Sequence, residues 1–278
     1  MDADLGRNEL LQGLAELEEM FQFRQHLAVH EMPIESLSGK SVLEIGCGAG
    51  AHSALFALHG AHVTSVDITF DRAHAGAQKF FLLGDKATGC IALQGDAEAL
   101  PLLDASFDIV YSNGVLHHTP ETERALDEVF RVLKPGGQAV IMLYCKSSFQ
   151  YWFNLWFCVG VLCGKLFTNP NWLGRSTEWI GNSPQKAFNP ITRCYTASEI
   201  LSLFQKFETV SLRKSEFYFG MIPKLGRLYR RWQARKYGSH PGGKLVYGSP
   251  WPIWSPLEQR LGKVMGWCWN IQAHKRNS

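Results

Sequence analysis

The sequence lacks the features of disulfide-stabilised and exported proteins. Its seven cysteines form no C-x-x-C pair and no regular spacing, so we expect reduced thiols and no metal site built on them. The polar, acidic start "MDADLGRNEL" has neither the basic residues nor the apolar core of a signal peptide. We therefore expect a cytoplasmic protein, and we leave open a peripheral contact with a membrane.

Tryptophan and acidic residues are missing from particular regions. None of the nine tryptophans lies before residue 150, so the two halves of the chain are built differently. No Asp or Glu occurs between Phe217 and Leu257, a segment that carries Lys224, Arg227, Arg230, Arg231, Arg235, Lys236 and Lys244. Such a segment suits an anionic membrane surface, although most charge runs are only solvated faces. The net charge of +3 is too small to indicate nucleic-acid binding.

Strand and helix patterns alternate in the first half of the chain. Short apolar runs predict strands at 41–45, 62–67, 90–96, 107–113 and 138–144. Helical spacing predicts helices at 8–29, 54–60, 72–83 and 121–133, the last ended by "KPGG". This alternation is typical of an α/β protein with a doubly wound parallel sheet.

The second half breaks this rhythm. "TASE" at 196–199 has the form of a capping box and predicts a helix to about Phe204, and strands are expected at 208–214 and 266–275. The aromatic stretch 149–167 has three interpretations. We favour a buried lid helix or a dimer surface, with a surface for lipid or an apolar substrate second. Gln150, Asn154 and Lys165 interrupt the stretch and argue against a membrane span.

A glycine-rich loop follows the first strand directly. Gly46-x-Gly48-x-x-Ala51 allows a close approach of the backbone to a ligand, and the following helix start presents free N–H groups. Asp67, about 20 residues further on, is placed to bind ribose hydroxyls. The pattern fits NAD or S-adenosylmethionine (SAM), and the alternative is a tight strand-helix turn without a ligand.

Two later blocks separate these cofactors. "GDAEALPLLDASFDIVYSNGVLHHTP" (95–120) and "RVLKPGGQAVIM" (131–142) resemble the class I SAM-dependent methyltransferases, in the branch of the ubiquinone and menaquinone methyltransferases and other small-molecule enzymes. The resemblance covers about residues 40–145 and the final strand. It implies a Rossmann-like seven-stranded sheet with an antiparallel last strand, and helical, aromatic insertions on the substrate side.

The resemblance also implies roles for single residues. Glu44, Gly46, Cys47, Gly48 and Gly50 would form the loop beneath the methionine part of SAM, with Cys47 as a small packing residue. Asp67 would bind both ribose hydroxyls. The remaining cofactor contacts would be Ile68 against the adenine, Asp96 and Ala97 at the adenine amino group, and Asn113 at the methionine amino group. The alternatives are a solvated strand end for Asp67 and a helix cap for Asp96.

Four residues are candidates for the acceptor side. His117 and His118 follow the fourth strand and face the expected site, where one could orient substrate or act as a base. Arg193 and Tyr195, within "NPITRCYTASE", suggest a loop over the substrate, with Tyr195 a third candidate base. The alternatives are that the histidines shape their loop by hydrogen bonding to backbone and that Arg193 belongs to a structural turn.

The sequence therefore predicts three regions and one leading function. The regions are an N-terminal helical cap (1–39), a SAM-binding core (40–145), and substrate-side insertions with closing strands of the same domain as the core (146–278). The leading function is direct methyl transfer from SAM to a small apolar or aromatic acceptor, without a metal. A silent SAM-binding or membrane-associated partner protein is the alternative, followed by an NAD-dependent oxidoreductase. No N-P-P-Y or D-P-P-Y block supports a nucleic-acid substrate, and a homodimer is left open.

Overall fold

The structure is a computed structural model, which describes residues 6–177, 190–222 and 225–277. Its centre is a seven-stranded sheet in the order β3-β2-β1-β4-β5-β9-β6. The strands are β1 (Ser41–Ile45), β2 (His62–Asp67), β3 (Ile91–Gln94), β4 (Phe107–Asn113), β5 (Leu133–Tyr144), β6 (Thr209–Ser215) and β9 (Cys268–His274). β9 runs antiparallel to both of its neighbours, β5 and β6, and the other strand pairs of this sheet are parallel, which confirms the expected architecture.

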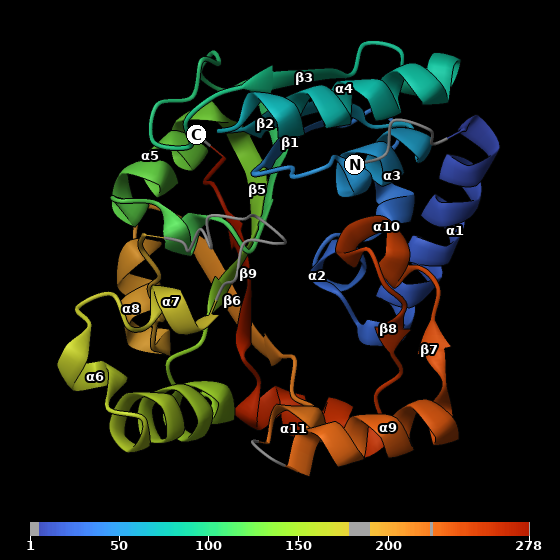
Figure 1. The fold of residues 1–278 in the computed structure, drawn as a ribbon. Coiled ribbons are helices and arrows are strands. Elements are labelled where there is room, and N and C mark those ends of the chain that lie inside the picture. The colour runs from blue at the N-terminus through green and yellow to red at the C-terminus, as the bar shows by residue number, and fades with distance from the viewer. Residues whose placement is uncertain (1–5, 178–189, 223–224, 278) are drawn as a thin grey trace.

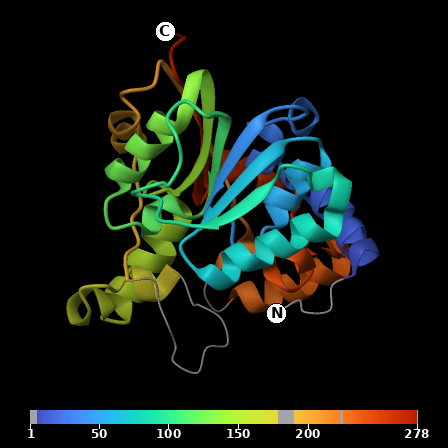
Figure 2. The ribbon, with the colours of Figure 1, turned by 90° about the horizontal axis from the view of Figure 1, so that it is seen from above.

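Helices cover both faces of the sheet (Figures 1 and 2). One face packs against α1 (Arg7–Arg24), α3 (Ala51–Leu58) and α4 (Phe70–Leu83), and the other against α5 (Thr122–Val132) and α8 (Ala197–Leu203). Successive strand residues point to opposite faces, so Val42 enters the first core and Leu43 the second. The hydrophobic strands are thus buried on both sides, as a parallel sheet requires.

The predicted element boundaries hold in most of the core. The runs 41–45, 62–67 and 107–113 are strands over those same residues, and Thr196 and Glu199 form the expected capping box. Smaller shifts occur at β3 and α3, and two boundaries differ by five residues. β5 begins at Leu133 because this residue pairs with Phe107, although "KPGG" reads as a turn. The N-terminal helix breaks at Gln25, which has φ 49°, and α2 (Leu27–His30) follows.

The N-terminal helices pack against the C-terminal part of the chain as well as against the core. α10 (Gly243–Tyr247) lies beside α1, with the β7 (Ser239–His240) and β8 (Trp251–Pro252) pair close by (Figure 1). Glu31, just after α2, receives two hydrogen bonds from Arg213 on β6, at 2.5 and 2.8 Å. Residues 1–39 and 146–278, predicted as separate regions, therefore share an interface, and their boundaries stay predictions.

The aromatic stretch 149–167 forms a π-helical segment, η4 (Gln150–Leu162), followed by α6 (Lys165–Thr168). The expectation of a buried lid helix was wrong, because Trp152 is 51 % exposed and only Asn154, Leu155 and Gly160 of η4 are buried. Along the parts of the chain that the structure describes, no helix is both long and apolar enough to span a membrane.

Two further helices were not anticipated from the sequence. They are α9 (Leu225–Tyr237) and α11 (Pro256–Met265). Short helical turns complete the described chain: η1 (Ile34–Ser36), η2 (Gly84–Ala87), η3 (Leu116–His118), α7 (Gly174–Thr177) and η5 (Phe219–Met221). The turn-rich stretch 171–193 predicts an ordered loop, of which α7 is a part and residues 178–189 lie outside the described chain.

Candidate active site

The glycine loop is pinned between two strand ends. The amides of Gly46 and Cys47 both donate to the carbonyl of Val66, at 2.7 and 3.1 Å. Gly46 has φ +75°, and a Cβ there would collide with the side chain of Val115. The loop therefore requires glycine at this position for both its backbone conformation and its close approach to the β4–η3 segment.

Gly50 allows a close contact between α3 and α4. It is the N-cap of α3 with φ +77°, and a Cβ there would lie 2.5 Å from the Cα of Gly76 in α4. The two helices thus touch through backbone, which sets the distance between the loop and the end of β2.

Asp67 is the best-defined polar group at this edge of the sheet. It ends β2, is only 7 % exposed, and accepts hydrogen bonds from the amide of Gly48 at 2.9 Å and from the amide and hydroxyl of Thr69 at 3.0 Å each. The next side chain, Ile68, is 67 % exposed. A carboxylate held in this way beside an exposed apolar side chain suits a ribose diol next to a flat base.

The other predicted cofactor residues lie at neighbouring strand ends. The amide of Gly95 donates to the carbonyl of Asp67 at 2.9 Å, so the Asp96 segment lies beside the end of β2. Asp96 is exposed and its Oδ1 accepts from the amide of Glu98, which closes a turn. The helix-cap alternative for Asp96 was wrong, since no helix follows it. Ala97 is buried, and Asn113 is the last residue of β4.

A buried polar network lies beneath the glycine loop. Ser53 donates to Glu44, whose other oxygen lies 3.6 Å from Nδ1 of His52, and that nitrogen is 3.0 Å from the hydroxyl of Tyr111. Burial raises the pKa of Glu44 to about 8. Burial, together with the charge of Arg24, lowers the pKa of His52 to about 4. Glu44 therefore acts below the loop as a mostly protonated, hydrogen-bonded group near neutral pH.

Cys47 is a buried part of the loop. The residue is 7 % exposed. Burial, with the nearby Glu44 and Asp67 charges, raises the pKa of the Cys47 thiol to about 12. A thiol with such a pKa is not a thiolate nucleophile at neutral pH, which agrees with its interpretation as a packing residue.

His117 and His118 have different surroundings. The ring of His117 is fully buried, with its centroid 3.8 Å from that of Tyr144 and 4.1 Å from that of His118. Neither ring nitrogen of His117 has a hydrogen-bond partner of normal geometry among the described residues. Burial is the largest cause that lowers the pKa of His117 well below the usual value, and the charge of His118 lowers it further. The His117 ring is therefore neutral near pH 7. His118 is half-buried, and its Nδ1 lies 3.0 Å from the carbonyl of Ile191.

The rings at the end of β5 extend this aromatic environment. Tyr144, the last residue of β5, also packs on Trp267, with 4.4 Å between ring centroids. Sequence reasoning did not single out Tyr144 or Trp267. The sequence signal that could have found Tyr144 was its position, because it ends a parallel strand at the edge where such sheets bind ligands.

Arg193 and Tyr195 lie in a segment fixed to the core. The guanidinium of Arg193 donates to the carbonyls of Thr119 and Pro120, at 2.5 and 2.6 Å. The hydroxyl of Tyr195 donates to Thr122 at 2.9 Å, and burial raises its pKa. These contacts are those of a structural turn that holds the η3 loop, and the substrate and proton-transfer roles of the two residues stay predictions.

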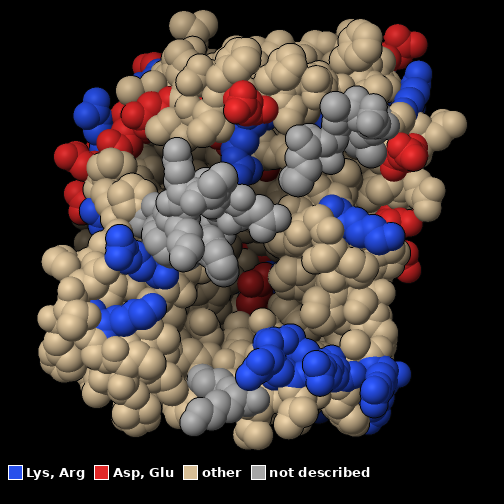
Figure 3. Space-filling model, in the orientation of Figure 1, with Lys and Arg blue, Asp and Glu red and all other residues tan. Residues whose placement is uncertain are grey.

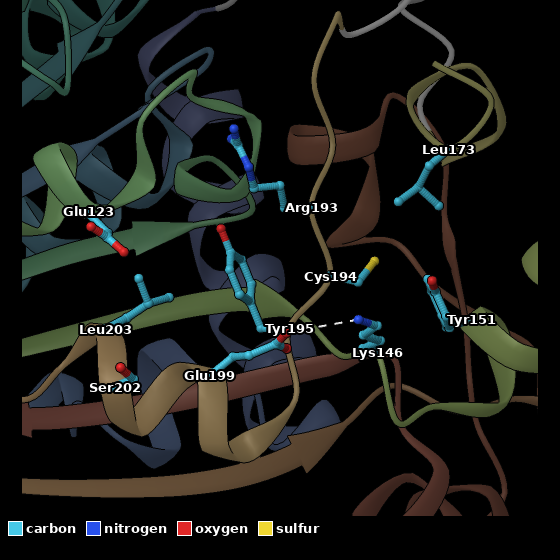
Figure 4. A pocket seen from close by; sticks show the side chains of 10 residues that line it. All are labelled: Glu123, Lys146, Tyr151, Leu173, Arg193, Cys194, Tyr195, Glu199, Ser202 and Leu203. Carbon is cyan, nitrogen blue, oxygen red and sulfur yellow. Dashed lines mark ion pairs between the residues drawn. The ribbon is translucent and has the colours of Figure 1, made fainter. Parts of the chain in front are cut away.

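A cavity of about 430 Å³ opens beside this segment (Figure 4). It is lined by Glu123, Lys146, Tyr151, Leu173, Arg193, Cys194, Tyr195, Glu199, Ser202 and Leu203. Lys146 and Glu199 approach to 3.9 Å within it. None of the predicted cofactor residues lines this cavity, so it is separate from the glycine loop.

Comparison with known proteins agrees with this geometry. Residues 43–141 match the family described as "Methyltransferase domain". The demethylmenaquinone methyltransferase of Clavibacter sepedonicus is 36 % identical over 115 residues, which are 41 % of this chain and 44 % of that protein. A sterol 4-C-methyltransferase of Caenorhabditis elegans is 34 % identical over 106 residues, 38 % of this chain and 31 % of that protein. This chain thus matches less than half the length of these two relatives.

Other relatives match over a longer stretch. The ubiquinone biosynthesis O-methyltransferase of Dechloromonas aromatica is 28 % identical and covers 63 % of this chain and 80 % of that protein. A SAM-dependent methyltransferase structure from Thermotoga maritima has a TM-score of 0.51 at 18 % identity, covering 95 % of this chain and 97 % of the other. The [4+2]-cyclase SpnF has a TM-score of 0.55 at 17 % identity, covering 92 % and 81 %. These structural likenesses show the fold.

The strand order, the glycine loop and the family match together define the class: residues 43–141 of this chain form a class I SAM-dependent methyltransferase domain. SAM is the cofactor of that class, and the residues fit it. The loop excludes a side chain at Gly46, and Asp67 holds a buried carboxylate at the end of β2, where the ribose contact is predicted.

Proposed function

We propose that this protein transfers the methyl group of SAM directly to a small acceptor that is apolar or aromatic. The observation that carries the acceptor class is the ring stack of His117, Tyr144 and Trp267 at the carboxyl end of β5. Flat rings at this sheet edge suit an apolar or aromatic acceptor better than a charged one. Three relatives are named as methyltransferases for demethylmenaquinone, for a sterol and for ubiquinone biosynthesis, and these names support an apolar acceptor.

When bound, SAM supplies an electrophilic methyl group on a sulfonium centre. The protein's own part is positional: the glycine loop and Asp67 hold the cofactor, and the ring stack holds the acceptor atom in line at about 3 Å from the methyl carbon. The same rings exclude water, which favours a reaction that neutralises charge.

The acceptor atom decides whether a base is needed. For a hydroxyl acceptor, His117 is our candidate for the group that takes the proton, because its ring is neutral and lies in the ring stack. Its lowered pKa makes it a weak base, so we expect positioning to contribute more to the rate than proton removal.

Titration calorimetry with SAM, S-adenosylhomocysteine and NAD is the first test. Micromolar binding of the first two and none of NAD supports the proposal, and binding of NAD alone overturns it. Labelled methyl transfer from SAM to quinol, phenol and sterol acceptors then tests turnover. Binding without transfer to any acceptor class would favour a silent SAM-binding protein.

A further inference from the structure

The segments η4 and α9 both lie towards the lower end of the molecule as it is drawn in Figure 1, and the chain between β6 and α9 connects them. Asn154 of η4 donates to the carbonyl of Met221 at 2.7 Å, and Phe149 packs on Phe217 with 5.6 Å between ring centroids. The amide of Gly226 in α9 donates to the carbonyl of Ile222, 2.8 Å away. We call the exposed side chains of Gln150–Leu162 and Leu225–Tyr237 together the η4–α9 surface.

The outer face of α9 combines apolar and basic side chains in separate rows. Its inner face is marked by the buried Gly226 and Gln233. Beside this inner face, Leu225, Leu228 and Trp232 are 63 %, 65 % and 48 % exposed, at a spacing that puts them in one row.

The basic row lies next to the apolar one. Arg227, Arg231 and Arg235 are spaced four residues apart and are exposed. Lys236 flanks the other side, with its Nζ 4.9 Å from the centre of the Trp232 ring. Figure 3 shows Lys and Arg side chains gathered in the region of α9 along the lower edge of this face.

The η4 part of the surface is aromatic. Trp152, Phe153, Trp156 and Phe157 are all between 37 % and 51 % exposed. The Trp152 and Trp156 rings pack in a T-shaped arrangement, and the Phe153 and Phe157 rings are tilted against each other. Burying such rings at a membrane interface is favourable, because tryptophan has an apolar body with a polar N–H at its edge.

The η4–α9 surface lies at the edge of the sheet that carries the active site. Tyr144 at the end of β5 and Ser215 at the end of β6 both pair with Cys268, the first residue of β9. The chain leaves β5 into η4 and leaves β6 towards α9 at this same edge. The segments η4 and α9 and the ring stack of Tyr144 and Trp267 therefore follow the same edge of the sheet.

The charge of this surface is one-sided. No Asp or Glu occurs between Phe217 and Leu257. Among the described residues, no ion pair joins Arg227, Arg231 or Arg235 to a carboxylate. Three exposed cations of one row thus present their charge to whatever lies against α9.

From these observations we propose that the η4–α9 surface docks the protein on a bilayer containing anionic lipid, with the aromatic side chains of η4 and the apolar row of α9 inserted at the headgroup level. The basic row pairs with lipid phosphates. The inference deepens the proposed function, since it makes the membrane the source of the apolar acceptor.

Charge and composition favour a bilayer over the other occupants. A symmetric contact between two copies would bring the α9 cations of both copies together and would be repulsive. A nucleic acid would pair with the cations but would leave the exposed Leu225, Leu228 and the η4 rings without an apolar partner. A lipid surface that contains anionic headgroups satisfies the cations and the apolar rows together.

Flotation with vesicles tests the proposal, using phosphatidylcholine alone and phosphatidylcholine mixed with phosphatidylglycerol. The full chain should bind the anionic vesicles and only weakly the neutral ones, and added salt should weaken binding. Replacing the basic row (Arg227→Gln, Arg231→Gln, Arg235→Gln) should lower the partition coefficient about 100-fold. Trp152→Ser with Trp156→Ser should lower it about 10-fold or more.

Matched controls separate the surface from general effects. Lys86→Gln with Arg124→Gln and Arg276→Gln removes the same charge from exposed positions elsewhere. Phe81→Ser with Leu103→Ser removes apolar side chains that are 84 % and 81 % exposed on other elements. Both controls should bind vesicles as the natural chain does. An equal loss in the controls, or no binding of the natural chain to anionic vesicles, overturns the proposal.

Light scattering and ligand titration distinguish the proposed docking on a bilayer from dimer formation and from failure of the cofactor site. Light scattering that shows a dimer dissociated by the surface variants would make a second copy the occupant and overturn the proposal. Titration with S-adenosylhomocysteine without vesicles reads the cofactor site alone. If vesicles bind and this ligand does not, the proposed function fails while the docking surface stands. The reverse result removes the docking surface alone.

Discussion

Among single residues, Asp67 combines burial with a carboxylate at the end of a parallel strand, and the amides of Gly48 and Thr69 hold it in place. Asp67→Ala should weaken SAM and S-adenosylhomocysteine binding at least 100-fold, because charge-assisted hydrogen bonds to the ribose are lost. Calorimetry measures this, with Asp85→Ala at an exposed turn as the control. An unchanged affinity in a folded variant would remove Asp67 from the ribose site.

Glu44 makes a prediction about pH. Its pKa is about 8 in the folded chain and lower in the unfolded chain, so between about pH 5 and pH 8 the unfolded state loses a proton that the folded state keeps. This group's contribution to the free energy of unfolding must therefore fall as pH rises through that window.

Glu44→Gln removes that dependence. Relative to the variant, the natural chain should lose about 3 kcal/mol between pH 5 and pH 8. Urea unfolding at several pH values measures the difference, and His52, which titrates with the opposite sign, is present in both proteins. The exposed Glu35→Gln is the control and should leave the profile unchanged. Parallel profiles for the natural chain and Glu44→Gln would contradict the raised pKa.

At the scale of elements, the contact of α3 with α4 depends on Gly50. Gly50→Ala should cost about 3 kcal/mol or more, since a Cβ would lie 2.5 Å from Gly76 and the backbone has a positive φ. Gly39 has φ +73° with nothing within 4 Å of its Cβ position, so Gly39→Ala should cost about 1 kcal/mol. Urea unfolding compares them, and equal costs would show that backbone conformation alone matters at Gly50.

Elements differed in how well the sequence predicted them. The strands β1, β2 and β4 are buried on both faces, so the apolar run in the sequence begins and ends where each strand does. Thr196 and Glu199 form a local capping box, which sequence spacing alone specifies. The exposure of η4 could not be read from its composition, because an aromatic stretch fits a buried lid or a surface equally well. α9 was missed because its solvent face mixes Leu228 and Trp232 with arginines.

At the scale of the whole molecule, ligand binding should stabilise the fold. S-adenosylhomocysteine at 100 times its dissociation constant should raise the free energy of unfolding by about 2.7 kcal/mol, because only the folded chain binds it. Thermal unfolding should then shift up by several degrees, and the shift should disappear in Asp67→Ala. NAD serves as the control and should cause no shift. A shift with NAD but not with S-adenosylhomocysteine would reassign the cofactor.

The sequence by itself determined the α/β order, the glycine loop, Asp67 as the polar strand end and the methyltransferase class. These are local features, in which spacing and residue type decide the conformation. Only the tertiary structure decided that Glu44 is buried with Ser53 and that β5 starts at Leu133. It also brought η4 and α9 together on one surface. These outcomes depend on contacts between segments far apart in the chain, and burial and charge pairing there follow from packing that no local pattern records.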